Sequence, residues 1–384
     1  MLTVIIFILV LGVLVLAHEF GHFIAARKSG MKVEEFGFGF PPRALGVRFL
    51  DNGKREWIWG NKESEGERTV YSINWLPIGG FVKIKGENGE AVVDQDSFMS
   101  KSAWKKTIVL AAGVVMNIVL AAVLLSVGYM IGLPQTTDDI SDGTVVKDAR
   151  VAILQVIEGK PAAQAGLKMG DEIIGIDAIK NPRIIQMQEY VDQNRDKEII
   201  FTIARGQKTF EKNIIPTLNS DTGKGGIGVA IAEVGLVKYP WHKAIYYGVI
   251  ATGSYLLAIV LAFWQLIAGL FVGKGAGSAV TGPVGIAVMT GQVARMGWAY
   301  LIQFTAMLSL NLAVINILPL PALDGGRILF TWLGKIFKKP VFMKFEQAAH
   351  TIGFMALLVL IFVVTAKDLW GFKSVFTNLW SKIF

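Results

Sequence analysis

Long uncharged apolar stretches constrain this chain more than any other feature of its sequence. Residues 2–17, 107–131, 298–320 and 351–366 contain no charged side chain, and the same holds for 244–272. A helix needs about 20 apolar residues to cross the ~30 Å hydrocarbon core of a bilayer. Hydrophobic residues make up 53% of the chain. The sequence therefore predicts an α-helical polytopic membrane protein.

We expect about four transmembrane helices, at residues 1–27, 106–132, 298–330 and 346–367. The first resembles a signal peptide in its position. It lacks a basic segment before its apolar run and a small-x-small cleavage site after it, so we interpret it as a retained helix.

The charge balance and the absence of cysteine limit the function. The formal net charge is +8, and the basic residues flank hydrophobic spans without forming a basic and aromatic array, so no nucleic-acid partner is expected. Because the chain has no cysteine, a metal ion has to be held by histidine, aspartate or glutamate. There are four histidines.

The first apolar run ends in His18-Glu19-Phe20-Gly21-His22. Residues four apart share one face of a helix, so His18 and His22 can both present an imidazole to one metal ion. Glu19 is placed to take a proton from an activated water. Polar side chains are costly inside lipid and usually functional there. The motif predicts a metal site within the membrane.

Catalytic zinc sites need a third protein ligand and one open position. His242 and His350 stand alone at expected helix starts. Asp324 follows Pro319 and Pro321, which break a helix at the end of an apolar span. By itself Asp324 is typical of a capping residue that faces water. Its occurrence together with the histidine pair favours it as the third ligand.

Residues 28–105 predict a β-rich segment between the first two spans. Phe36-Gly37-Phe38-Gly39-Phe40-Pro41-Pro42 and Trp75 to Ile84 alternate like strands with turn residues between them. Such strands can dip into a membrane when neighbouring protein satisfies their backbone groups. The pattern leaves open a soluble connecting sheet as the alternative to a membrane-associated or re-entrant segment.

Residues 140–232 predict a soluble α+β domain. We expect strands at 151–157, 172–176, 199–204 and 209–215, with helices at 160–167 and 184–194. The stretch from Pro161 to Asp177 resembles bacterial PDZ domains, although Asp177-Ala178 stands where many relatives have a glycine. The resemblance implies binding of extended peptides by strand addition. A spacer without a ligand is the alternative.

The motif from His18 to His22 in the first helix and the segment from Asn316 to Gly326 in a late helix together resemble the site-2 protease family of intramembrane zinc metalloproteases. With one PDZ-like domain, the chain is most similar to the bacterial regulator-of-sigma-E type. The resemblance implies Zn²⁺ held by His18, His22 and Asp324, Glu19 as general base and acid, and Asn316 as a substrate or oxyanion contact. It also implies a bacterial inner-membrane location and anti-sigma factors or remnant signal peptides as substrates.

Three further residues belong to the predicted substrate-binding set. Pro319 and Pro321 flank the break before Asp324. Asn117 lies in Gly113-Val114-Val115-Met116-Asn117, which keeps the glycine and the asparagine of a family pattern and lacks its proline. Asn117 is therefore either a substrate contact or a polar residue that bonds between helices.

Ligands of one ion lie at one depth, so the helices that carry the histidines and Asp324 have to run in the same direction. A single crossing by 244–272 would put Asp324 on the wrong side. We therefore predict that 243–297 is re-entrant or interfacial and turns back between Gly273 and Gly291.

Basic residues set the predicted orientation. They follow both motifs, so the active site is expected near the cytoplasmic side. The PDZ-like domain and both termini are expected outside, and residues 368–384 are expected to form an amphipathic tail on the membrane surface. The basic residues are Arg27, Lys28, Lys32, Lys335, Lys338, Lys339 and Lys344.

The sequence thus predicts hydrolysis of peptide bonds within transmembrane protein or peptide substrates. Strands near Phe36–Phe40 or Trp75–Lys85 are candidates for holding such a substrate extended. The lipid bilayer and a peptide ligand of the PDZ-like domain are further expected partners. The rival functions are a non-catalytic peptide-binding scaffold with a structural zinc and a metal transporter. Glu19 argues against the scaffold, and the few polar residues in the spans argue against the transporter.

Overall fold

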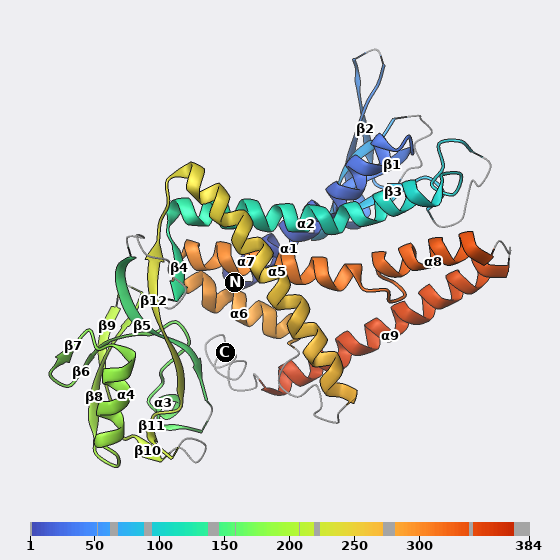
Figure 1. Cartoon of the computed structure of the whole chain (residues 1–384). Coiled ribbons are helices and arrows are strands. Elements are labelled where there is room, and N and C mark those ends of the chain that lie inside the picture. The colour runs from blue at the N-terminus through green and yellow to red at the C-terminus, as the bar shows by residue number, and fades with distance from the viewer. Residues whose placement is uncertain are drawn as a thin grey trace. The chain divides into compact units, whose positions relative to one another are not determined.

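The computed structural model describes residues 2–51, 53–61, 68–87, 94–136, 146–157, 159–206, 208–218, 223–271, 281–337 and 341–371. The chain forms two compact units. One comprises Met1–Val123, Ile250–Met289 and Thr305–Phe384, and the other comprises Leu124–Val249 and Thr290–Phe304. Figure 1 traces the helices and strands of each.

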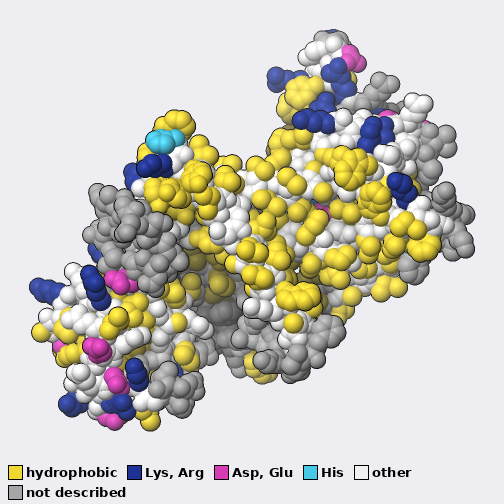
Figure 2. Space-filling view, viewed as in Figure 1, with side chains coloured by type: hydrophobic (Ala, Val, Ile, Leu, Met, Phe, Trp, Pro, Cys, Tyr) yellow, Lys and Arg dark blue, Asp and Glu magenta, His cyan; other side chains and the backbone are white. Residues whose placement is uncertain are grey.

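Five helices in the described part of the chain are long and apolar enough to cross a membrane. Their exposed apolar side chains include Leu257, Trp264 and Phe362, and Figure 2 shows hydrophobic side chains gathered over the helical part of the surface. The expectation of a multi-pass helical protein is confirmed at this level. The five helices are α1 (Leu2–Lys28), α2 (Ala103–Ile131), α5 (Trp241–Phe271), α7 (Trp298–Ile317) and α9 (Val341–Gly371).

The segment 243–297 differs from the expected irregular turn. Helix α5 is unbroken over 31 residues, and α6 (Pro283–Met296) begins within the range from Gly273 to Gly291 where the chain was expected to turn back. Proline suits the first turn of a helix. The carboxylate of Asp368 accepts a hydrogen bond from the Gly285 backbone N–H at 2.7 Å, which caps that turn. Residues 272–280, which include Gly273, lie outside the described residues.

The expected helix at 298–330 is two helices. Helix α7 ends at Ile317 and α8 (Asp324–Phe337) begins at the predicted metal ligand. Proline lacks a backbone N–H and clashes with the preceding turn, so Pro319 and Pro321 end α7. At Gly326 a Cβ would overlap the Leu320 carbonyl oxygen, so only glycine lets α8 fold back this closely on the connecting loop.

The predicted β-rich segment is confirmed as a sheet of β1 (Val33–Phe49), β2 (Arg55–Trp59) and β3 (Val70–Ile84), in the order β2-β1-β3. Strand β3 folds back so that Phe36 of β1 is opposite both Val82 and Tyr71. Residues 35–38 are therefore paired on both sides and cannot accept a further strand. The prediction that Phe36–Phe40 offers a free edge is wrong at Phe36–Phe38, and the outer edge belongs to residues 80–84.

Helix α1 packs closely against that outer segment. A Cβ on Gly80 would lie 3.4 Å from Leu16 Cδ1, and one on Gly79 would lie 3.0 Å from Val15. A buried cluster joins the end of α1 to the sheet and to α2, and a Val, Ile, Phe or Met side chain contributes about 1.5–3 kcal/mol when fully buried. Its members include Phe23, Ala26, Met31, Val33, Ile84 and Val109.

The second unit contains the predicted soluble domain. Its sheet has the order β4-β12-β5-β6-β8-β9, with β7 (Ile179–Lys180) paired to β6, and β10 (Thr217–Leu218) pairs with β11 (Gly225–Gly226). The expected strands and helices are present, and β4 and β12 extend the sheet beyond 140–232. The other elements are β4 (Leu133–Thr136), β5 (Val146–Val156), β6 (Glu172–Ile176), β8 (Ile199–Arg205), β9 (Lys208–Ile214), β12 (Val229–Val237), α3 (Pro161–Gln164) and α4 (Ile184–Gln193).

The departure from the PDZ pattern at Asp177 has a structural explanation. Asp177 has φ 47°, a left-handed conformation that aspartate tolerates better than most residues. Its carboxylate accepts hydrogen bonds from the Ile200 backbone N–H at 2.9 Å and from the Tyr190 hydroxyl at 2.8 Å. The aspartate thus holds this left-handed turn with its own side chain.

Candidate metal centre and active site

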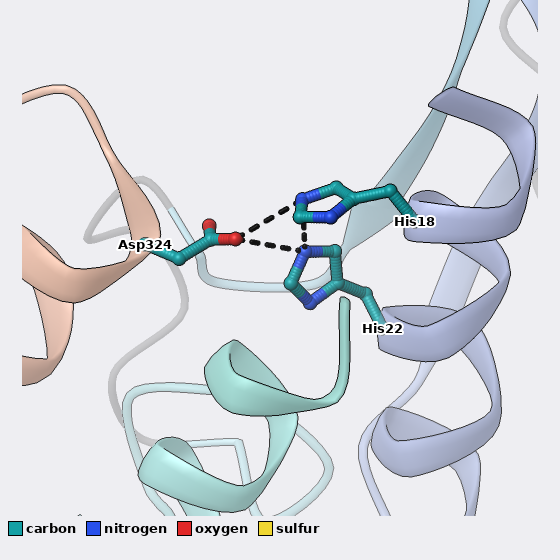
Figure 3. A group of neighbouring side chains, drawn as sticks. All are labelled: His18, His22 and Asp324. Atoms are coloured by element: carbon teal, nitrogen blue, oxygen red, sulfur yellow. Dashed lines mark hydrogen bonds and ion pairs between the residues drawn. The ribbon is translucent and has the colours of Figure 1, made fainter. Parts of the chain in front are cut away.

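Three predicted ligands converge at the end of α1 that carries the histidine motif. His18 and His22 lie one helical turn apart with their Nε2 atoms 3.2 Å apart. The Oδ2 atom of Asp324, from the first turn of α8, lies 3.1 Å from His18 Nε2 and 3.4 Å from His22 Nε2. Figure 3 shows the three side chains pointing at one another. Both histidines are buried.

The spacing and the chemistry of these atoms fit zinc. Tetrahedral Zn²⁺ with ligands at about 2.0–2.2 Å separates its ligand atoms by about 3.3–3.6 Å. The Asp324 Oδ2 atom is buried and has no hydrogen-bond partner of good geometry, although it lies within ion-pair distance of both histidines. A buried carboxylate oxygen without a partner is costly, and a cation at this point would remove the cost. Two histidines and one aspartate also leave a fourth position open.

Backbone and amide groups orient the two imidazoles. His22 Nδ1 lies 2.8 Å from the Val109 carbonyl oxygen of α2, so Nδ1–H donates there and Nε2 keeps its lone pair. The Asn117 amide lies 3.3 Å from His18 Nδ1, and its buried Oδ1 has no partner. With the amide turned so that Oδ1 accepts from Nδ1–H, that oxygen is satisfied and His18 also presents a free Nε2 lone pair.

Glu19 contacts the sheet edge. Its Oε2 atom accepts a hydrogen bond from the Val82 backbone N–H at 3.1 Å. Successive residues of a strand point their N–H groups to opposite sides, and this N–H points away from β1. The predicted general base is therefore held at the outer edge of residues 80–84.

The structure brings two of the four predicted substrate residues to the metal ligands. Asn117 contacts His18 as described, and Asn316 Nδ2, in the last turn of α7, lies 3.4 Å from His18 Nε2. Pro319 is exposed, and Pro321 abuts Gly353 of α9, where a Cβ would lie 2.5 Å from the Pro321 Cβ. In the described part of the chain, no recorded contact joins either proline to the three ligands.

Sequence reasoning did not give Gly113 a role at the metal centre. A Cβ at this position of α2 would lie 2.5 Å from His22 Nε2 and 2.7 Å from His18 Cε1. Gly113 thus leaves the space that both imidazoles occupy. The available signal was its spacing from Asn117, because residues four apart share the helix face that meets α1.

The expectation that His350 marks a helix start is wrong, because it lies inside α9. Its Nδ1 atom accepts a hydrogen bond from the Ala322 backbone N–H at 2.9 Å, and Ala322 has φ 75°. Arg327 of α8 forms an ion pair with Glu87 in the turn after β3. These two contacts hold the loop and the helix that carry Asp324.

A multi-pass helical protein with this histidine, glutamate and aspartate arrangement falls in the class of membrane-embedded metalloproteases. The family model "Peptidase family M50" matches residues 6–360. The chain therefore belongs to peptidase family M50, the site-2 protease family, and it is a zinc metalloprotease with Zn²⁺ as its cofactor.

Curated relatives match over nearly their whole length. A putative zinc metalloprotease of Clostridium perfringens is 34% identical over 363 residues, covering 94% of this chain and 97% of that protein. The regulator of sigma-W protease RasP of Bacillus subtilis is 30% identical, covering 96% and 98%. Among solved structures, the PDZ domain of an SdrC-like protein from Listeria innocua is 27% identical over 22% of this chain and 93% of that chain, with a TM-score of 0.20.

Proposed function

We propose that His18, His22 and Asp324 hold the zinc and that the chain cleaves peptide bonds within or beside transmembrane segments. The convergence of two histidines inside the apolar helix α1 with Asp324 at the start of α8 carries this proposal. When bound there, Zn²⁺ supplies Lewis-acid activation of a water molecule and of the scissile carbonyl.

Glu19 acts as the general base and then as the general acid. It takes a proton from the attacking water and delivers it to the amine nitrogen that leaves as the peptide bond breaks. The hydrogen bond from Val82 N–H orients the carboxylate for both transfers. Asn316, beside His18, is placed to contact the substrate or the developing oxyanion, and Asn117 orients His18.

A transmembrane helix hides its carbonyl groups in its own hydrogen bonds, so it has to unwind before cleavage. The outer edge of residues 80–84 is the part of the predicted Trp75–Lys85 edge that lies at Glu19. Glu19 already takes the Val82 N–H of this edge, so we assign to the remaining outward-facing backbone groups of residues 80–84 the role of holding the unwound substrate by strand addition. We assign Pro319 and Pro321 an indirect role, in which they shape the loop before Asp324.

The relatives point to a class of substrate. One relative is named as a regulator of sigma-W protease, and on that basis we propose anti-sigma factors or remnant signal peptides as substrates. The PDZ-like domain would then bind a peptide or filter substrates by size. The non-catalytic scaffold is the rival function, and it needs no base at position 19.

For the topology we propose four crossings, with α5 lying at the interface. Helix α6 has 14 residues, about 21 Å, and is too short to return across a ~30 Å core. The basic residues after His22 and in α8 favour the cytoplasmic side for the metal site and the inner membrane as the location. The tail beyond Gly371 and Lys338–Lys339 lie outside the described residues.

Removal and return of the metal test the proposal. The purified full chain, in detergent with a transmembrane peptide, should lose cleavage on treatment with a chelator and regain it when zinc is added. Asp324→Ala should bind less zinc and fail to regain activity, because one of three ligands is lost. Full cleavage by chelated protein or by Asp324→Ala would contradict the ligand assignment.

A further inference from the structure

A basic cavity lies beside the C-terminal end of α1, and none of the three metal ligands lines it. Its volume is about 860 Å³, and the ends of α1, β1 and β3 line it. Four cationic side chains and one carboxylate face it, so it has a net positive charge. These five residues are Arg27, Lys32, Arg68, Lys85 and Asp96.

Two of the four cations already have acidic partners. Lys85 Nζ lies 2.8 Å from both Asp94 and Asp96, which raises the pKa of Lys85 and lowers the pKa of Asp96. Arg68 is paired with Asp51. In the part of the chain that the structure describes, neither Arg27 nor Lys32 forms an ion pair, and the Arg27 guanidinium lies 5.6 Å from the Phe23 ring centroid.

The end of α1 does not need these two cations. Basic side chains near a helix C-terminus often bond the last free carbonyls. Here the carbonyls of Ala25, Ala26 and Arg27 accept hydrogen bonds from the backbone N–H groups of Ser29, Met31 and Gly30, at 2.9–3.1 Å. Gly30 has φ 71°, as such a helix end requires. The charges of Arg27 and Lys32 are thus available to a ligand.

The surroundings indicate the kind of ligand. Helix α1 is a candidate span that ends at Lys28, so the cavity lies where a span meets the headgroup region. Phe49 and Tyr71, whose ring centroids are 6.0 Å apart, add an aromatic wall of the kind that favours this depth. We propose that the cavity binds the phosphate of an anionic lipid headgroup, through Arg27 and Lys32.

Lipid retention by the full-length protein tests this site. The purified chain is incubated in detergent with equal amounts of phosphatidylglycerol and phosphatidylcholine, and bound lipid is counted by native mass spectrometry. We expect a preference for phosphatidylglycerol that falls roughly fivefold for each cation removed, in Arg27→Gln and Lys32→Gln. Lys105→Gln, an exposed lysine at the start of α2 outside the cavity, is the matched control and should retain the lipid.

Three results would overturn the proposal. They are equal retention of the two lipids by the wild type, unchanged retention in the Arg27→Gln/Lys32→Gln double variant, and an equal loss in Lys105→Gln. A separate arm titrates inorganic phosphate against the bound lipid. Displacement of the lipid by phosphate at comparable concentration would assign the cavity to a soluble anion and so contradict the lipid assignment. Unchanged zinc content in each variant shows that the protein remains folded.

Discussion

At the residue scale, the two imidazoles reach one point because α1 repeats every 3.6 residues and because α2 leaves room for them. The first condition is local, so the sequence alone predicted His18 and His22 as a pair. The second depends on where α2 meets α1, and nothing local to Gly113 reveals that meeting. Asp324 was predictable only through its joint occurrence with the histidines, since an isolated aspartate at a helix start is usually a cap.

Gly113→Ala should reduce zinc affinity by about tenfold or more, because its Cβ would lie 2.5 Å from His22 Nε2 and displace a ligand. Zinc content after dialysis against a buffered zinc series measures the effect. Gly253→Ala in α5 is the matched control, since nothing lies within 4 Å of its Cβ and alanine favours helices. Equal zinc affinity in both variants would show that Gly113 has no role in shaping the site.

At the element scale, the sequence predicts where a helix ends and where strands occur better than it predicts how the strands pair. The prolines predicted the end of α7 near residue 319, and alternation predicted strands in 28–105. The double pairing of β1 with β3 was not predictable, because register depends on contacts between residues far apart in the chain. That register decides which edge is free, and it places Val82 rather than Phe36 beside Glu19.

Val82→Pro should lower the rate of peptide cleavage by about tenfold or more, while Val82→Ala should retain most of it. Proline removes the N–H that donates to Glu19, a hydrogen bond to a charged group worth about 1.5–3 kcal/mol. This N–H faces away from β1, so the β1–β3 ladder keeps its bonds. Initial rates on a transmembrane peptide, with zinc content checked in parallel, measure the effect. Equal rates in the two variants would contradict the assignment of this edge.

At the scale of the whole molecule, the proposed number of crossings follows from where the three proposed metal ligands meet. His18 lies near the C-terminal end of α1, and Asp324 follows the C-terminal end of α7. Because both residues lie at one site, α1 and α7 approach it from the same side. Composition alone favours a crossing by α5, which is as apolar as a true span. Length and apolar content describe α5 by itself. The metal site adds a constraint on α7, which has to run in the same direction as α1, and this constraint argues against a crossing by α5.

Single introduced cysteines can test this arrangement cleanly because the chain contains none of its own. If α5 lies at the interface, Lys243→Cys and Thr281→Cys should react with a membrane-impermeant maleimide from the same side. Both positions are exposed. Lys105→Cys, before α2, should react from the opposite side and calibrates the assay. Labelling of positions 243 and 281 from opposite sides would show that α5 crosses the membrane.

Catalysis by Glu19 is the central claim, and cleavage by Glu19→Gln tests it most directly. The purified wild type and Glu19→Gln are loaded with zinc, matched for zinc content and given the same transmembrane peptide. Glutamine keeps the size of the side chain and removes the base, so the variant should hold zinc equally and lose at least about 100-fold in cleavage rate. Cleavage at the wild-type rate by zinc-loaded Glu19→Gln would contradict the account.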